Sequence, residues 1–169
     1  MEVLIKLCEK YDGEIYQNGI RQYENYLPLN MVNDIKASLF YKQKNIIIKK
    51  VVRFNPYYIY MPIENKKNIQ ILIRHKTVLN SLRNWIGKGS QVIGQYELVG
   101  EEIYINRLQR NKQLMKSIAE NDLTIEVTSK PHPAILLKPF HGIENVRKGE
   151  EYFEILYKLE AQLENRARY

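Results

Sequence analysis

Residues 35–73 read IKASLFYKQKNIIIKKVVRFNPYYIYMPIENKKNIQILI and contain the clearest local pattern in the chain. Apolar and polar side chains alternate over 35–42, and runs rich in β-branched or aromatic residues follow at 45–54, 57–63 and 69–73. Alternation and runs of this kind are typical of β-strands. The connections between them are short enough for antiparallel neighbours. The pattern therefore predicts a four-stranded antiparallel meander.

Helical spacing of apolar residues occurs on both sides of the meander. It predicts short helices over 2–11 and 78–86, each ending at a glycine-containing turn. Two more helices are predicted over 107–120 and 149–167. In the last of these the apolar residues recur at near-heptad spacing, which indicates that one face of the helix is buried.

Further strands are predicted over 92–98, 101–105, 123–127 and 134–138. The resulting order is helix, four strands, helix, strands, helix, strands, helix. A parallel sheet would instead require strict alternation of strands and helices. The sequence therefore predicts one α+β domain over 1–169, with a mainly antiparallel sheet and helices packed on one face.

The composition is that of an ordinary globular protein. Of the 169 residues 44% are hydrophobic and 27% are charged. Cys8 is the only cysteine, so no internal disulfide can form, and a reduced, cytoplasmic setting is expected. The longest apolar runs are far below the roughly 20 residues that a membrane-spanning helix requires. We expect a soluble protein without a signal peptide.

The net charge of +7 is unevenly distributed along the chain. Residues 1–85 hold 14 Lys and Arg against 7 Asp and Glu, whereas residues 86–169 hold 12 of each kind. The excess is densest over 36–88, where Glu64 is the single acidic residue among 12 basic ones. A one-sided block of this kind can attract a polyanion.

The residues expected to contact a polyanion are cations and tyrosines of the basic meander, residues 36–76. Cations neutralise phosphates, and aromatic rings stack on unpaired bases. The candidate residues are Lys36, Lys42, Lys49, Lys50, Arg53, Tyr57, Tyr58, Tyr60, Arg74 and Lys76. The alternative interpretation is that these lysines only solubilise the outer face of the sheet and discourage edge-to-edge pairing.

The glycine-rich segment 89–94, GSQVIG, is close in pattern to a phosphate-binding loop. Such a loop would continue with Lys and Ser or Thr, but Gln95 and Tyr96 follow here. It would also lead from a strand into a helix, whereas this segment follows a predicted helix and precedes a predicted strand. The segment is therefore interpreted as a turn that uses the conformational freedom of glycine.

Three histidines are the only imidazoles in the chain: His75, His132 and His141. His132 and His141 flank the predicted strand 134–138, which would place them roughly 20 Å or more apart. A zinc site normally requires several convergent ligands. We therefore predict neither a metal site nor a cofactor, and we interpret the loops that carry His132 and His141 as structural.

Two segments carry a resemblance to known domains. They are Gly87-Lys88-Gly89 through Ile125, and Pro139-Phe140-His141-Gly142-Ile143. With the preceding helix and meander, their order resembles that of uncharacterised bacterial α+β domains of unknown function. In those domains an N-terminal helix and a meander precede a helix, a Gly-rich turn, a strand–helix–strand unit and a final helix. The resemblance implies this outline of the fold, and it implies no activity and no functional residue.

Three functional hypotheses follow. The first is a non-catalytic binding module for a polyanion, either nucleic acid or an acidic membrane surface, that binds through the basic meander. The second is a protein–protein interaction or assembly domain, homo-oligomers included, because tyrosine-rich surfaces suit interfaces. The third is an enzyme whose site is assembled near His132 or His141.

Overall fold

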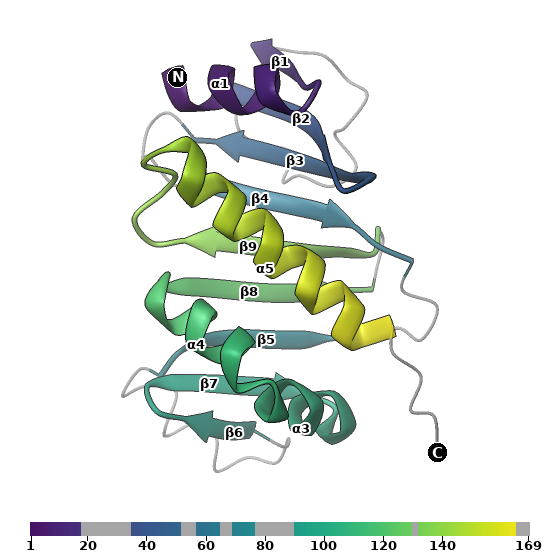
Figure 1. Ribbon diagram of the computed structural model, residues 1–169. Helices are drawn as coiled ribbons and strands as arrows, with labels where there is room; N and C mark the ends of the chain where they lie inside the picture. The colour runs from purple at the N-terminus through teal and green to yellow at the C-terminus, as the bar shows by residue number, and fades with distance from the viewer. Residues whose placement is uncertain (18–34, 52–56, 65–68, 77–89, 130–131, 165–169) are drawn as a thin grey trace.

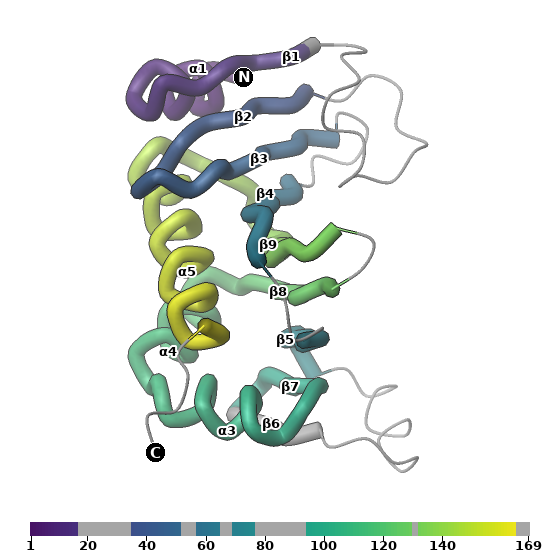
Figure 2. The backbone as a smooth tube through the Cα atoms, turned by 90° about the vertical axis from the view of Figure 1, so that its right-hand side faces the viewer, coloured from purple at the N-terminus to yellow at the C-terminus, as the bar shows by residue number. Residues whose placement is uncertain are grey.

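The computed structural model describes residues 1–17, 35–51, 57–64, 69–76, 90–129 and 132–164. Over these residues the strands form one sheet, and the described helices all lie on one side of it (Figures 1 and 2). Every strand pair in the sheet is antiparallel. The predicted α+β class with a mainly antiparallel sheet is therefore confirmed.

The sheet has nine strands in the described part of the chain. They are β1 (Glu14–Gln17), β2 (Ile35–Tyr41), β3 (Lys44–Lys50), β4 (Tyr57–Pro62), β5 (Ile71–His75), β6 (Ser90–Ile93), β7 (Tyr96–Gly100), β8 (Leu123–Thr128) and β9 (Ala134–Pro139). Their spatial order is β1-β2-β3-β4-β9-β8-β5-β7-β6. The hairpin β8–β9 is therefore inserted between strands that come much earlier in the sequence.

This insertion corrects the predicted four-stranded meander. Strands β2, β3 and β4 are consecutive neighbours as predicted, but β4 pairs with β9, and β5 pairs with β8 and β7. In the register, Ile59 of β4 lies opposite Leu137, and Ile73 of β5 lies opposite Ile125. All four side chains are fully buried. The alternation of residues specifies which face of a strand is buried but does not identify its neighbour.

The described helices are α1 (Glu2–Lys10), α3 (Glu102–Arg110), α4 (Lys112–Glu120) and α5 (Val146–Glu164). The first and last match predicted helices closely, whereas the predicted helix 78–86 lies outside the described residues. The predicted strand 101–105 is wrong, because it falls mostly within α3. Tyr104, Ile105 and Leu108 are buried at helical spacing, and this packing overrides the local β-propensity.

The predicted helix 107–120 is divided into α3 and α4 at Asn111. The side chain of Asn111 accepts a hydrogen bond from the Leu114 backbone N–H at 3.1 Å, as an N-cap residue does. A new helix therefore begins at Lys112. The change of direction at Asn111 turns α4 back across the sheet (Figure 1).

The main core lies between the sheet and the helices. Leu4 and Leu7 of α1, together with Phe153, Leu156 and Leu159 of α5, are fully buried in it. Figure 2 shows α5 lying across the middle strands, with α1 and α4 towards its two ends. The predicted inward face of the closing helix is thus confirmed.

Cys8 is also buried, on the inner face of α1, and this burial raises the pKa of its thiol. A thiol with a raised pKa is a poor nucleophile.

None of the helices in the described ranges combines the length and the apolar character needed to cross a bilayer.

Candidate functional site

The residues predicted to bind a polyanion are divided between the two faces of the sheet. Lys36, Lys49, Tyr58, Tyr60 and Arg74 alternate with core residues and therefore lie on the face away from the helices. Lys49 and Tyr60 are buried there, with 2% and 5% of their surface exposed.

The other predicted residues do not join that group. Tyr57 belongs to the main core, and the Lys50 ammonium lies 5.4 Å from its ring centroid. Lys42 lies in the β2–β3 turn, where its ammonium is 2.6 Å from a carboxylate oxygen of Glu154 in α5. Lys76 is exposed just after β5. Arg53 lies outside the described residues.

Acidic residues of α5 compensate much of the basic excess of the first half. The ion pairs are Lys10–Glu150, Lys42–Glu154 and Lys44–Glu160, with N···O distances of 2.5, 2.6 and 2.9 Å. On the other face, Arg74 pairs with the fully buried carboxylate of Glu97 at 3.1 Å. In the described part of the chain, four basic side chains of the first half are therefore paired with carboxylates of the second half.

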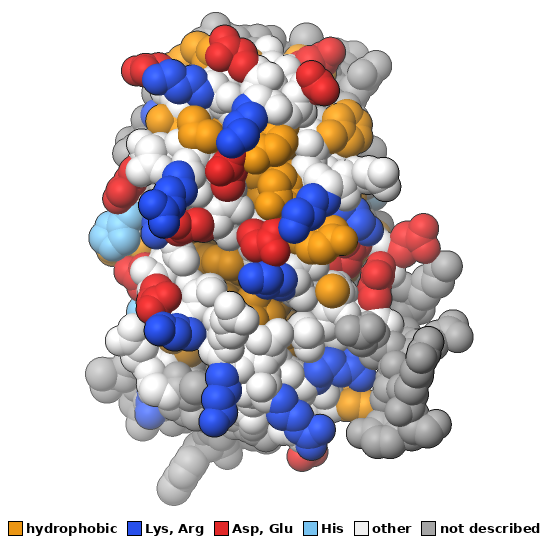
Figure 3. All heavy atoms as spheres, in the orientation of Figure 1, with side chains coloured by type: hydrophobic (Ala, Val, Ile, Leu, Met, Phe, Trp, Pro, Cys, Tyr) orange, Lys and Arg blue, Asp and Glu red, His pale blue; other side chains and the backbone are white. Residues whose placement is uncertain are grey.

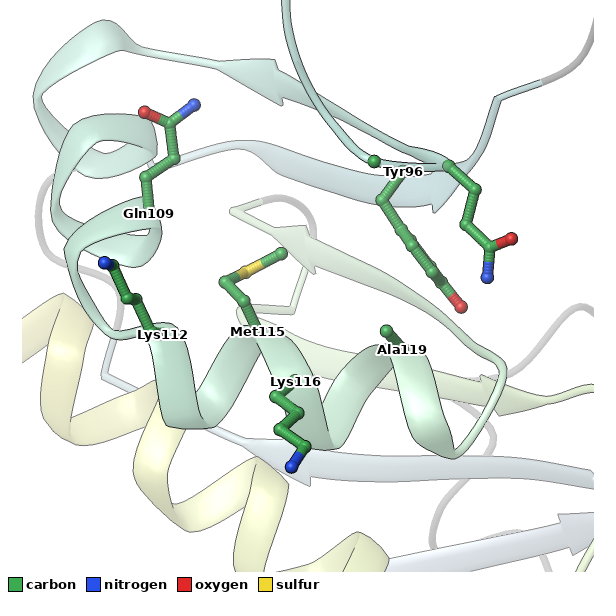
Figure 4. A pocket seen from close by; sticks show the side chains of 8 residues that line it. Tyr96, Gln109, Lys112, Met115, Lys116 and Ala119 are labelled. Atoms are coloured by element: carbon green, nitrogen blue, oxygen red, sulfur yellow. The ribbon is translucent and has the colours of Figure 1, made fainter.

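A pocket of about 810 Å³ lies between α4 and the β6–β7 turn (Figure 4). Its lining residues are Gly94, Gln95, Tyr96, Gln109, Lys112, Met115, Lys116 and Ala119. The volume falls within the range of roughly 300–1,000 Å³ that is usual for small-molecule sites. The pocket therefore has the size of a ligand site.

Two local features of the sequence build this pocket. Gly94 has φ +58°, and this left-handed conformation lets the chain turn tightly from β6 into β7. On the opposite wall, four residues at positions i, i+3, i+4 and i+7 share one face of α4. They are Lys112, Met115, Lys116 and Ala119.

The pocket has an apolar floor and a cationic rim. Met115 and Tyr96 are buried, with 7% and 2% of their surface exposed. Lys112 and Lys116 are exposed one helical turn apart. Lys116 lies 3.5 Å from Glu120, in an exposed pair that contributes little to stability. Within the described ranges Lys112 makes no ion pair.

A polar cluster adjoins the Tyr96 end of the pocket. The Tyr96 hydroxyl lies 2.8 Å from Nε2 of His75, and the same nitrogen contacts Oδ1 of Asp122. Nε2 of His141 lies 3.5 Å from the other carboxylate oxygen of Asp122. The four residues come from the end of β5, the start of β7, the α4–β8 turn and the β9–α5 loop.

Burial of Tyr96, and then the negative charge of Asp122 and a hydrogen bond to it, raise the pKa of the Tyr96 phenol to about 12. The phenol is therefore neutral at physiological pH. A neutral phenol has one O–H to donate and lone pairs that can accept.

The sequence-based search for sites missed both the pocket and the cluster. His75 and Asp122 are 47 residues apart and meet only because β5 lies beside β8. His141, predicted to be a structural loop residue, belongs to the cluster. The sequence did contain one signal for the pocket: Lys112 and Lys116 flank Met115 on one face of a helix. The helical pattern alone predicts only that the helix has a buried face.

His132 lies in the loop before β9, where its backbone oxygen accepts a hydrogen bond from the Thr128 hydroxyl at 3.4 Å. Within the described ranges no three His, Cys, Asp or Glu side chains are arranged so that they could hold a metal ion.

Comparison of the chain with protein-family models, with curated proteins and with solved structures finds no match.

Proposed function

We propose that this protein is a binding module for an organic anion, which it holds in the pocket along α4. One observation carries the proposal: Lys112 and Lys116 line the same pocket as the buried side chains of Met115 and Tyr96. Ligand sites typically combine a mainly apolar lining with a few polar groups that fix orientation. A lysine ammonium is a strong partner for a carboxylate or a phosphate.

The surroundings of the pocket add to its positive charge. Residues 102–120 contain four basic side chains and two acidic ones, Glu102 and Glu120. The basic ones are Arg107, Arg110, Lys112 and Lys116. Figure 3 shows Lys and Arg side chains gathered over α3 and α4. A cluster of one sign raises the local concentration of oppositely charged ligands.

Arg107 and Arg110 differ in their availability to a ligand. Arg107 donates a hydrogen bond to the Gln162 carbonyl oxygen at 2.8 Å and lies 5.7 Å from the Tyr104 ring centroid, so it joins α3 to α5. Arg110 is exposed at the end of α3. We therefore assign ligand contact to Lys112 and Lys116, and long-range attraction to Arg110.

The basic meander is the weaker candidate for an anion site. Lys49 is buried, and Lys42 is already paired with Glu154. If Arg74 turned towards a phosphate, the buried Glu97 carboxylate would lose its partner. Leaving a buried charge unpaired costs roughly 3–5 kcal/mol, more than an exposed phosphate contact recovers.

The proposal is tested with biphenyl-4-carboxylate, which combines an anionic group with an apolar body of suitable length. Calorimetry should show saturable binding to the parent protein. Lys112→Gln with Lys116→Gln should weaken the affinity roughly tenfold, because charge-assisted contacts are lost.

The matched control is Lys6→Gln with Arg147→Gln. It removes the same charge from exposed residues of α1 and α5, at the other end of the sheet from α4 (Figure 1). This variant should bind the probe as the parent does. Equal losses in both variants, or no binding to the parent protein, would refute the proposal.

A further inference from the structure

We infer that the polar cluster makes anion binding dependent on pH, because His75 and His141 gain positive charge at the edge of the pocket as the pH falls. The inference rests on the proposed function and specifies how that site is regulated. Three observations support it: the cluster is attached to two walls of the pocket, its histidines can be protonated without losing their contacts, and its net charge changes sign when they are.

The first observation is the position of the cluster. The hydroxyl of Tyr96, which lines the pocket, lies 2.8 Å from Nε2 of His75, and the centroids of the two rings are 4.3 Å apart. On the α4 side, the Asp122 backbone N–H donates a hydrogen bond at 3.1 Å to the carbonyl oxygen of Ala119, another lining residue. Figure 4 shows the Tyr96 hydroxyl on the Ala119 side of the pocket. The charges of the cluster therefore lie close to a ligand at this end of the pocket.

The second observation concerns the two ring nitrogens of each histidine. An ionised carboxylate only accepts hydrogen bonds, so Nε2 of His75, which contacts Oδ1 of Asp122, carries the proton of the neutral ring. A second proton is gained at Nδ1. The His75 side chain is 39% exposed, and that of His141, which lies 3.5 Å from Oδ2 of Asp122, is 63% exposed. Both rings can therefore take up a proton from solvent while they remain beside Asp122.

The third observation is the charge of the cluster. The carboxylate of Asp122 carries one negative charge, which opposes the binding of an anion at this end of the pocket. Histidine is the side chain whose charge ordinarily changes between pH 5 and 8. Protonation of His75 and His141 adds two positive charges to the one negative charge, so the net charge of the cluster changes from −1 to +1.

The other charges around the cluster stay constant over this pH range. The Tyr96 phenol, whose pKa burial raises to about 12, remains neutral. Arginine, lysine and glutamate side chains ordinarily keep their charge between pH 5.5 and 8. The charged residues within three positions of the cluster along the chain are Arg74, Lys76, Glu97, Glu120, Lys138 and Glu144. The two histidines are therefore the groups through which pH acts on the pocket.

The sign of the pH dependence follows from these charges. A bound anion favours the protonated form of each histidine, so binding takes up protons and the affinity rises as the pH falls. At a separation on the order of 10 Å, two added charges tighten binding roughly three- to tenfold, even at a dielectric constant close to that of water. The lysines of α4 attract the anion at every pH, and the cluster adjusts its affinity.

The test is a calorimetric titration of biphenyl-4-carboxylate at pH 8, 7, 6 and 5.5. The carboxyl group of the probe stays ionised over this range, so a change in affinity reports on the protein. The parent protein should bind the probe roughly three- to tenfold more tightly at pH 5.5 than at pH 8. Titrations at pH 6.5 in two buffers of different ionisation enthalpy should show net uptake of protons on binding.

Replacing both histidines of the cluster should abolish this dependence. His75→Gln with His141→Gln should bind the probe at pH 8 as the parent does, which confirms that the pocket is intact, but its affinity should not rise in acid. Glutamine keeps an N–H group that can donate to Asp122. The matched control is His132→Gln, since His132 lies before β9 and His141 after it, roughly 20 Å away along the strand. This control should keep the pH dependence of the parent.

A permanent charge at the cluster gives a second, independent readout. His141→Lys changes an exposed side chain and places a positive charge beside Asp122 at every pH in the series. This variant should bind the probe more tightly than the parent at pH 8, and its affinity should change less between pH 8 and 5.5.

Three results would overturn the inference: equal affinity of the parent at pH 8 and 5.5, a rise in acid that persists in the double glutamine variant, or unchanged affinity of His141→Lys at pH 8. The proposed function fails in a different way. Absence of binding to the parent at every pH refutes anion binding itself, whereas binding that does not depend on pH refutes only its regulation by the cluster.

Discussion

The hydroxyl of Tyr11, the residue that follows α1, donates a hydrogen bond to Oε1 of Glu150 in α5, across 2.6 Å and 139 positions of sequence. The Lys10 ammonium lies 2.5 Å from the same oxygen. The hydrogen bond from Lys10, followed by that from Tyr11, lowers the pKa of Glu150. One carboxylate therefore joins the N-terminal helix to the helix that covers the sheet.

This relationship predicts a loss of stability in acid. The pKa of Glu150 is lower in the folded than in the unfolded protein. The contribution of its carboxylate to the free energy of unfolding is therefore complete above the ordinary glutamate pKa of about 4.3. This contribution is lost as the pH falls through the pKa that Glu150 has in the folded protein. Glu150→Gln should lower the free energy of unfolding by about 0.5–1 kcal/mol at pH 7, since the pair is partly exposed. Urea denaturation at pH 7, 5 and 3 measures this.

The control for that series is Glu151→Gln, which removes the neighbouring carboxylate with its exposed contacts to Arg147 and Lys148. The difference between the Glu150→Gln variant and the parent should shrink towards pH 3. A difference that stays constant over this range would show that the carboxylate acts by packing and not by its charge.

The pKa of Tyr96 should change when Asp122 is replaced by a neutral residue. Asp122 has φ +53°, a conformation that asparagine also tolerates, so Asp122→Asn keeps the turn. We expect the pKa of Tyr96 to fall below about 12 but to stay above that of a free tyrosine, because burial is the larger cause of its shift. Ultraviolet titration of both proteins, each with and without Tyr96→Phe, isolates this phenol. An unchanged pKa of Tyr96 would contradict the interaction between Asp122 and this phenol.

Gly13 is a position where a side chain should not fit. A Cβ atom there would lie 2.7 Å from Leu39 Cβ and 2.8 Å from the backbone oxygen of Ser38. Gly13→Ala should therefore destabilise the protein by about 1–3 kcal/mol, as overpacking does. Thermal unfolding measures this, and an unchanged midpoint would contradict the close packing of the α1–β1 turn on β2.

The closing helix should be necessary for folding. Phe153, Leu156 and Leu159 are fully buried against the sheet, and Leu156→Ala should cost about 2–5 kcal/mol. A chain truncated after Gly149 should not fold. Cooperative melting of the truncated chain near the parent temperature would contradict the role assigned to α5.

The local pattern of residues was sufficient to predict most helices and strands, but it did not predict which strands are neighbours in the sheet. The alternation in 35–42 fixed the buried face of β2, and the spacing of Phe153 and Leu156 predicted the inner face of α5. The sequence had no local signal that β8 and β9 separate β4 from β5, because that arrangement depends on contacts between distant segments. The segment 101–105 has β-propensity, yet packing of Tyr104 and Ile105 selects a helix.

The candidate site was harder to predict for the same reason. Charge counted along the sequence pointed to 36–76, but the fold brings Glu150, Glu154 and Glu160 to lysines of the first half. The lysines of α4 lie in the second half of the chain, where basic and acidic residues are equal in number, so the charge count did not indicate them. Their significance depends on the pocket beside them, which forms only where the fold brings α4 opposite the β6–β7 turn.

The central claim is that an organic anion binds beside Met115, and methionine methyl NMR tests it most directly. The chain has four methionines, of which Met115 lines the pocket and Met61 is buried in the core of the sheet. Addition of biphenyl-4-carboxylate should shift the Met115 methyl resonance saturably and leave Met61 unmoved, with a weaker response in Lys112→Gln, Lys116→Gln protein. Saturable binding that leaves Met115 unmoved, or no saturable shift of any methyl resonance, would contradict the account.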